Sequence, residues 1–149
     1  MKELILILLF GKAILLTMSP VNLNNNWLEL TPLKTFKALN RGASLNVQLS
    51  TDDMILKSIN HNEDIFSQLD KLIPDGTIEA AVVDENNSVI ELSNKDFSIS
   101  DSTFSREDSV RIILVPRKPF PTGVDFKLVK IRSNIKLNNV NIFWKNYSK

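Results

Sequence analysis

The chain has 149 residues, of which 43% are hydrophobic and 23% charged, and its formal net charge is +1. This length corresponds to a single domain that can bury a substantial core without covalent cross-links. The chain contains no cysteine, which excludes disulfides, thiolate metal sites and thiol nucleophiles. The mixed composition, with eight Phe and two Trp, excludes a disordered or collagen-like chain.

The beginning of the chain has the outline of an export signal. A charged start precedes an apolar run at residues 4–10, and candidate cleavage sites end at Ala13 and at Ser19. A retained anchor is the alternative. Residues 4–18 would rise about 22 Å as a helix, against roughly 30 Å for the hydrocarbon core of a bilayer, and Lys12 would lie near the middle.

A third interpretation makes this segment part of the folded domain. Two observations disfavour it: residues 4–10 carry no polar face of either period, and the Asn-rich residues 22–26 are typical of a linker. We therefore predict a signal peptide or membrane anchor at residues 1–20, a linker at 21–26 and a domain at 27–149. The predicted location is periplasmic, secreted or anchored in the membrane by residues 4–18.

From Trp27 onward, short apolar stretches alternate with turn-forming clusters, as in a sandwich or barrel. Residues 43–49 alternate like a half-buried strand, and residues 77–83 and 88–92 predict a hairpin around an Asn-containing turn. The chain has sixteen Asn against four Gly. Asn is therefore expected to supply the positive φ angles of turns, notably in the groups at 22–26, 86–87 and 138–139.

The last third is the most strand-like part of the sequence. Residues 109–115 are apolar on both faces, which predicts a central strand covered on each side. Within residues 124–133 the apolar positions change parity near Leu128, which predicts a β-bulge or a bend there. Val140, Ile142 and Trp144 resume a regular alternation.

One segment has a helical period. Residues 62–73 place apolar side chains at 65, 66, 69, 72 and 73, with an Asn as candidate N-cap. The predicted fold is therefore all-β: an antiparallel β-sandwich of about seven or eight strands with one short amphipathic helix, preceded by an N-terminal apolar signal or anchor helix.

Charge is distributed unevenly along the chain. Residues 20–105 contain six basic and thirteen acidic side chains, whereas residues 106–149 contain ten basic and three acidic ones. Strands from the two halves can lie side by side, so one interpretation is cross-strand charge pairing. The other is a basic face that meets an anionic partner such as lipid headgroups or an acidic glycan. That face would be built from Arg111, Lys127, Lys130, Arg132 and Lys145.

The proline-rich residues 116–123 form the most distinctive segment, since they present Arg117 and Lys118 beside Phe120. Such a loop suits an interface or an anionic ligand, although a stiff connection with Phe120 packed onto the core is the alternative. Aromatic residues could also form a stacking platform for sugars or close a core; these are Trp27, Trp144 and Tyr147. The candidate ligand- or partner-binding residues are Arg111, Arg117, Lys118, Phe120, Lys127, Lys130, Arg132 and Trp144.

Catalytic and metal sites find little support. His61 is the one histidine, and no Gly-x-Ser-x-Gly elbow is present to pair with it. Residues 60–64 begin like a calcium-binding loop, but Ile65 and Lys71 occupy the positions that need Gly and Glu. The oxygen-bearing side chains at 84, 86 and 88 are more typical of a turn. We predict no catalytic residue, no metal and no cofactor.

The predicted function is a non-catalytic binding or assembly module of the cell envelope, exported or tethered to a membrane. Its partner would be a protein or an anionic glycan, with membrane contact through the N-terminal segment. No nucleic-acid-binding module is recognisable, so no nucleic-acid partner is expected. The alternative is a carboxylate-based hydrolase acting on polysaccharide, which needs two carboxylates facing each other across a cleft.

Overall fold

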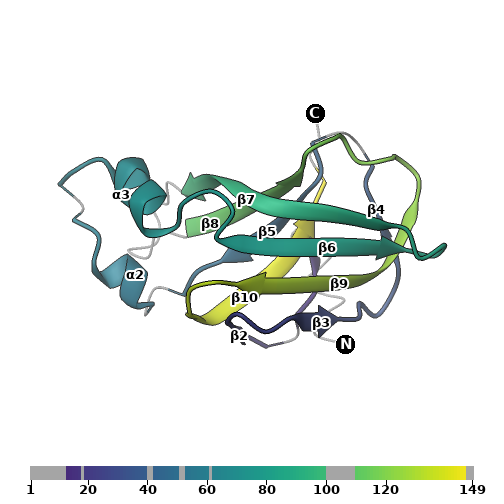
Figure 1. The fold of residues 1–149 in the computed structure, drawn as a ribbon, viewed down its shortest axis with the longest axis horizontal. Coiled ribbons are helices and arrows are strands. Elements are labelled where there is room, and N and C mark those ends of the chain that lie inside the picture. The colour runs from purple at the N-terminus through teal and green to yellow at the C-terminus, as the bar shows by residue number, and fades with distance from the viewer. Residues whose placement is uncertain are drawn as a thin grey trace.

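A computed structural model describes residues 13–17, 19–39, 42–50, 53–60, 62–99 and 110–146. Within them, ten strands form one antiparallel sheet and two short helices lie at one end of it (Figure 1). The strands are β1 (Ala13–Leu15), β2 (Val21–Leu23), β3 (Leu28–Leu30), β4 (Phe36–Lys37), β5 (Ser44–Gln48), β6 (Ile78–Asp84), β7 (Val89–Ile99), β8 (Val110–Pro116), β9 (Asp125–Ser133) and β10 (Leu137–Lys145). The helices are α2 (Met54–Lys57) and α3 (Ile65–Leu72).

The sheet curls into a half-barrel with two layers. Its strands follow the order β1-β10-β5-β8-β7-β6-β9-β3, with β2 also paired to β10 and β4 to β9. In Figure 1, β7, β6 and β9 lie toward the viewer, and β8, β5 and β10 lie behind them. The eleven-residue strand β7 joins the layers, because its first part pairs with β6 and its later part with β8.

The predicted all-β, antiparallel fold is confirmed. The described residues contain ten strands instead of the expected seven or eight, since β1, β2, β3 and β4 have only two or three residues each. Segments this short carry too little alternation to be recognised in a sequence. The layers also belong to one continuous sheet, whereas a sandwich has two packed sheets.

The core lies between the two layers. Inward side chains of β5, β8 and β10 form aligned rows, one of which joins Leu114, Leu45 and Trp144. All three side chains are fully buried. The opposite layer contributes the buried side chains of Val82, Val129 and Ile131. Burial of this apolar interior is the main stabilising contribution to the fold.

The β-bulge predicted near Leu128 is present. The register between β6 and β9 shifts so that Val83 lies opposite Leu128, while Asp84 lies opposite Phe126. The shift places Phe126 and Val129 in the same core, whereas Leu128 is half-buried on the outer side. One extra residue thus corrects the parity of the strand.

Asn residues supply positive φ angles in two of the three predicted groups, and none is found among the described residues 22–26. Asn87 in the β6–β7 turn has φ 65°, and Asn139 has φ 57° within β10, where the register with β2 shifts. Few side chains other than Asn tolerate these conformations. In the β6–β7 hairpin, Oδ1 of Asp84 accepts hydrogen bonds from the backbone N–H groups of Asn86 and Ser88 at 2.8 and 2.9 Å. The predicted hairpin is therefore confirmed together with its turn chemistry.

Helix α3 confirms the helix predicted at residues 62–73, but it begins later. Its N-cap is Asp64, not Asn62, because the Asp64 carboxylate accepts a hydrogen bond from the Phe66 N–H at 3.1 Å. Leu69 on its inner side is fully buried. The one-turn helix α2 has no counterpart among the predicted elements.

The first described residues pair with the last strand. β1 runs antiparallel to β10, with Ile14 opposite Trp144. The Leu16 N–H donates to the carbonyl of Ile142 at 2.9 Å, and Oγ1 of Thr17 accepts from the Ile142 N–H at 3.3 Å. The side chains of Leu16 and Thr17 are both buried. Residues 13–17 therefore contribute to the sheet.

This pairing differs from the secondary structure expected at the N-terminus. β1 falls within the predicted apolar helix, and β2 falls within the predicted linker, where Leu23 is buried in the core. Backbone pairing with β10 and burial of apolar side chains favour strands there. Residues 1–12 lie outside the described residues, so the signal or anchor remains a prediction.

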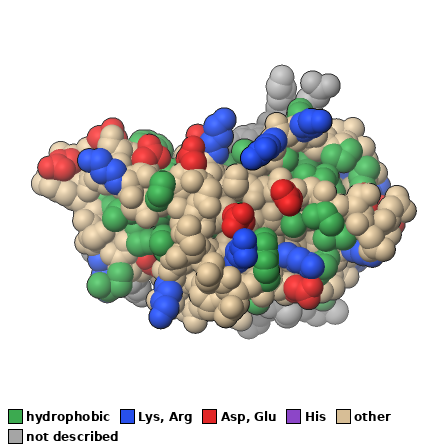
Figure 2. All heavy atoms as spheres, viewed as in Figure 1, with side chains coloured by type: hydrophobic (Ala, Val, Ile, Leu, Met, Phe, Trp, Pro, Cys, Tyr) green, Lys and Arg blue, Asp and Glu red, His purple; other side chains and the backbone are tan. Residues whose placement is uncertain are grey.

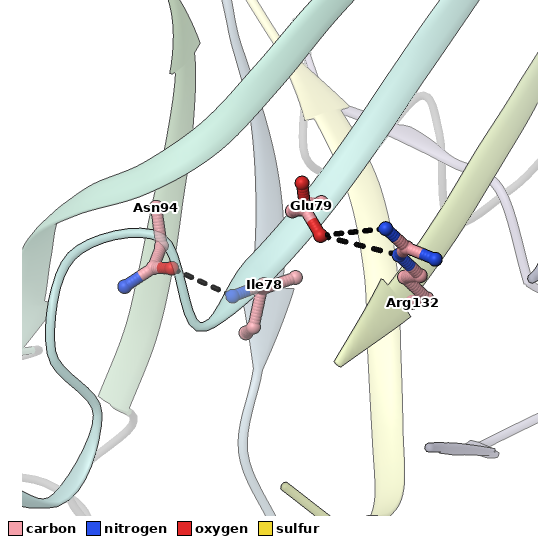
Figure 3. A network of polar contacts seen from close by, with 4 residues as sticks. All are labelled: Ile78, Glu79, Asn94 and Arg132. Atoms are coloured by element: carbon pink, nitrogen blue, oxygen red, sulfur yellow. Dashed lines mark hydrogen bonds and ion pairs between the residues drawn. The ribbon is translucent and has the colours of Figure 1, made fainter. Parts of the chain in front are cut away.

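The side chain of Asn94, on β7, forms hydrogen bonds with the connection between α3 and β6. Its Oδ1 accepts a hydrogen bond from the Ile78 N–H at 2.7 Å (Figure 3), and its Nδ2 donates to the Pro74 carbonyl at 3.1 Å. The side chain is 1% exposed. We expect Asn94→Ala to lower the free energy of unfolding by about 1–3 kcal/mol, because it removes the acceptor of a buried N–H.

Urea denaturation followed by circular dichroism measures this loss. Ser93→Ala is the matched control, since Ser93 is the exposed neighbour on the same strand, and its effect should stay within about 0.5 kcal/mol. Equal midpoints for Asn94→Ala and the unsubstituted protein would contradict this structural role.

Candidate functional surfaces

The curled sheet has two outer faces, and the predicted basic residues divide between them. Lys127, Lys130 and Arg132 lie on β9 in the front layer, whereas Arg111 on β8 and Lys145 on β10 lie in the layer behind (Figure 1). The five cations therefore do not share one face. The two faces differ in the side chains that surround these cations.

The outer side of β3, β9 and β6 forms an ion-paired face, defined by Trp27, Glu29, Glu79, Lys130 and Arg132. Arg132 Nη2 lies 3.0 Å from Glu79 Oε1 (Figure 3), and its guanidinium group lies 4.4 Å from the ring centroid of Trp27. Lys130 Nζ lies 3.8 Å from Glu29 Oε1. Acidic and basic side chains alternate across this side of the molecule in Figure 2. This is the predicted cross-strand charge pairing.

Two further lysines of the front layer have local partners. Lys127 Nζ donates a hydrogen bond to Oδ1 of Asn87, the residue with positive φ in the hairpin turn, at 2.6 Å. Lys37 Nζ lies 3.8 Å from Asp125 Oδ1 across the β4–β9 pair. Exposed ion pairs such as Lys37–Asp125 contribute only about 0–1 kcal/mol to stability, and the hydrogen bond to the neutral Asn87 amide does not neutralise Lys127.

The outer side of β1, β10, β5 and β8 forms a second surface, which we call the cationic face. Arg111 lies 5.9 Å from the ring centroid of Phe143, and its Nη2 donates a hydrogen bond to Oγ of Ser98 at 2.9 Å. Lys145 projects from the same side of β10 as Phe143. The face is defined by Leu15, Arg111, Ile113, Val115, Phe143 and Lys145.

Strand β8 places a row of apolar side chains on the cationic face. It lies between β5 and β7, as predicted for a central strand. Ile112 and Leu114 point inward and are fully buried, but Ile113 and Val115 point outward and are only half-buried. The expected cover on both sides of this strand is therefore incomplete, and part of the second apolar row reaches solvent.

The two cations of this face influence each other. Burial lowers the pKa of the Lys145 amino group below its usual range, and the positive charge of Arg111 lowers it further. The protonated form of Lys145 is thus disfavoured by its surroundings. An anion bound beside Arg111 and Lys145 would offset this repulsion, which makes the cationic face suited to an anionic ligand.

The loop at residues 116–123 combines a core contact with surface charge. Phe120 is 3% exposed, and its ring packs edge-on against Trp144 with the centroids 5.0 Å apart. Phe120 is therefore packed onto the core, as in the alternative interpretation of this loop. Arg117 and Lys118 are exposed, and the loop leaves β8 at the end of the cationic face that carries Lys145.

Trp144 closes the core at the same end of the half-barrel. It is fully buried, and its indole N–H donates to the carbonyl of Lys37 at 3.2 Å. The rings packed against it are those of Phe36, Phe120 and Phe126. Of the other residues predicted for a sugar-stacking platform, Trp27 is exposed and Tyr147 lies outside the described residues.

The remaining candidate sites concern catalysis and metals. His61 lies outside the described residues. Asp84 uses Oδ1 to hold the hairpin turn, which is the turn-forming role weighed above against calcium binding. Within the part of the chain that the structure describes, no three His, Asp or Glu side chains gather as a metal ion would require. The absence of a catalytic residue, metal or cofactor stays a prediction.

Four partly exposed apolar residues of the cationic face are absent from the predicted site: Leu15, Ile113, Val115 and Phe143. The sequence contained one indication of this apolar surface. Residues 109–115 carry a second row of apolar side chains, which can lie on an exposed outer face as well as under a covering layer. Leu15 and Phe143 join that row through pairing of the first and last strands. Such pairing between distant segments has no sequence signature.

Comparison of the chain with protein-family models, with curated proteins and with solved structures found no match. The class that the structure defines is an all-β protein built on one curled antiparallel sheet. None of the described helices has the length and apolar character needed to cross a bilayer.

Proposed function

We propose that this protein is a non-catalytic binding module of the cell envelope that meets an anionic partner through its cationic face. The observation that carries the proposal is the position of Arg111 and Lys145, which project from the same outer side of the sheet on either side of the partly exposed Phe143. Burial and, as the smaller cause, the positive charge of Arg111 lower the pKa of Lys145. The described residues of β1, β5, β8, β10 and the part of β7 that pairs with β8 present one outward acidic side chain. This is Asp96, which lies opposite Ile113.

The ion-paired face is expected to bind an anion less strongly. Arg132 and Lys130 each have a carboxylate partner from a neighbouring strand, so an incoming anion would compete with Glu79 and Glu29. On the cationic face, Arg111 and Lys145 lie beside apolar side chains, among them Phe143, whose ring is in contact with Arg111. We therefore expect an anionic partner to bind the cationic face in preference.

The proposed place of action is outside the cytosol. Residues 4–10 have the apolar composition of an export signal or anchor, and the chain has no cysteine that would need protection from oxidation. Exported or tethered in this way, the module would display its binding face to partners of the envelope.

Charge removal on one face at a time tests the proposal. The probe is dextran sulfate, a soluble polyanion, titrated against the full chain at low and physiological salt concentration. We expect Arg111→Gln with Lys145→Gln to weaken binding by about fivefold or more and to flatten its salt dependence. Urea denaturation of each variant verifies that the fold is intact.

The matched control removes the same amount of charge from the ion-paired face. Lys130→Gln with Arg132→Gln should leave dextran sulfate binding within about twofold of the unsubstituted protein, because both cations are already paired. Equal losses in the two double variants would show that net charge, and not the cationic face, governs binding.

A further inference from the structure

We propose that the anionic partner is a lipid bilayer surface, onto which the cationic face docks with its apolar side chains at the lipid boundary. This inference rests on the proposed function and names the partner of the same surface. Its evidence is the arrangement of apolar and basic side chains on that face.

Apolar side chains occupy the centre of the cationic face. In the strand pairing, Leu15 lies opposite Phe143, and Phe143 and Ile113 flank Asn46 of β5 on either side. Leu15, Phe143 and Ile113 are all partly exposed, whereas Asn46 is buried beneath its neighbours. A hydrated polyanion offers these side chains no apolar counterpart, but the boundary between headgroups and acyl chains does.

The cations lie on both sides of this apolar centre along the strands. Arg111 pairs with Gln48, on one side of the row that contains Phe143, and Lys145 pairs with Ser44 on the other side. Long basic side chains can keep an apolar stem against the protein while the charged group reaches the level of lipid phosphates. Attraction to anionic headgroups and burial of apolar area would therefore act together.

Further basic groups extend the surface at one end. Arg117 and Lys118 are exposed in the loop after β8, near the end of the face that carries Lys145. The ion-paired face carries two outward carboxylates, Glu29 and Glu79, which anionic lipid would repel, whereas the described strands of the cationic face carry one, Asp96. This asymmetry favours one orientation of the sheet on a membrane.

The most apolar segment of the sequence shortly precedes a strand of the cationic face. β1 forms the edge of the face, and the apolar run at residues 4–10 shortly precedes β1 in the sequence. A segment whose composition favours a bilayer is thus joined to the sheet at the border of the surface proposed to lie on one.

Vesicle binding by the full chain tests the inference. Co-sedimentation is measured with vesicles of phosphatidylcholine, with and without phosphatidylglycerol, so that background binding by residues 4–10 is common to all samples. We expect a preference for the anionic vesicles, reduced about thirtyfold by Arg111→Gln with Lys145→Gln. Lys130→Gln with Arg132→Gln should leave the preference unchanged.

A second pair of variants separates a bilayer from a soluble polyanion. Ile113→Ser with Phe143→Ser should weaken binding to anionic vesicles on the order of tenfold. Dextran sulfate binding should weaken far less, by about twofold or less through the contact between Phe143 and Arg111, because both cations are retained. Val89→Ser with Leu128→Ser, at outward positions of the front layer, is the control for lost apolar surface and should bind vesicles normally.

The outcomes distinguish the inference from the proposed function. Binding to dextran sulfate without a preference for anionic vesicles would overturn membrane docking and leave the proposed function intact. Vesicle binding that ignores the Ile113 and Phe143 changes would also overturn docking through this face. If Arg111→Gln with Lys145→Gln bound both dextran sulfate and anionic vesicles as well as the unsubstituted protein does, both proposals would be overturned.

Discussion

Trp144→Ala is expected to lower the free energy of unfolding by about 3–5 kcal/mol, a large part of the about 5–15 kcal/mol typical of a single domain. Trp144 is fully buried, and its ring centroid lies 4.9 Å from that of Phe36, 5.0 Å from Phe120 and 5.8 Å from Phe126. Removing the indole leaves a cavity among three rings and removes one of two hydrogen bonds to the Lys37 carbonyl, the other being donated by Asn146 Nδ2 at 3.1 Å.

Urea denaturation followed by circular dichroism measures this effect. Trp27→Ala is the natural control, since Trp27 is the other tryptophan of the chain and is 46% exposed. Losing its contact with Arg132 should cost no more than about 1 kcal/mol. Similar losses for the two variants would contradict the position of Trp144 at the centre of the aromatic cluster.

Leu16→Asp is expected to destabilise the protein by at least about 3 kcal/mol or to prevent folding, because it places an unpaired carboxylate among apolar side chains. Leu16 is 8% exposed and belongs to the core cluster. Ser19→Asp introduces the same charge three residues later at an exposed position, and its effect should stay within about 0.5 kcal/mol.

This pair tests whether residues 13–17 belong to the folded body. Soluble yield and urea midpoints are compared for both variants, and Leu16→Ala, expected to cost about 2–5 kcal/mol, provides a measurable substitute if the aspartate variant does not fold. Near-normal stability of both Leu16 variants would place this segment outside the folded body. Such a result would return it to the signal or anchor predicted at residues 1–20.

Elements with a clear period could be predicted from the sequence. The strand at residues 43–49, the hairpin turn with Asn87 and the bulge near Leu128 follow from alternation, turn chemistry and parity. The edge strands could not be predicted, because two or three residues show no period. The apolar residues before Pro20 have the same composition in a signal and in a buried strand, so hydropathy alone could not separate the two.

The candidate site was harder to predict than the fold. Alternation indicates that Arg111 and Arg132 point outward, but it does not reveal which outer face each one joins. That depends on strand order, which places β8 beside β5 and β9 beside β6. Phe120 raised a similar ambiguity, since a proline-rich loop can present an aromatic ring to a partner or return it to the core.

β10 is the described strand farthest along the chain, and three other strands pair with it. These are β1, β2 and β5, and the hydrogen bond between Ile142 and Thr17 joins residues 125 positions apart. Contacts of such long sequence separation form slowly, and these cannot form before residues 137–145 leave the ribosome. Until then β1, β2 and β5 lack their shared partner strand, which favours an unfolded nascent chain of the kind that threading through a translocon requires.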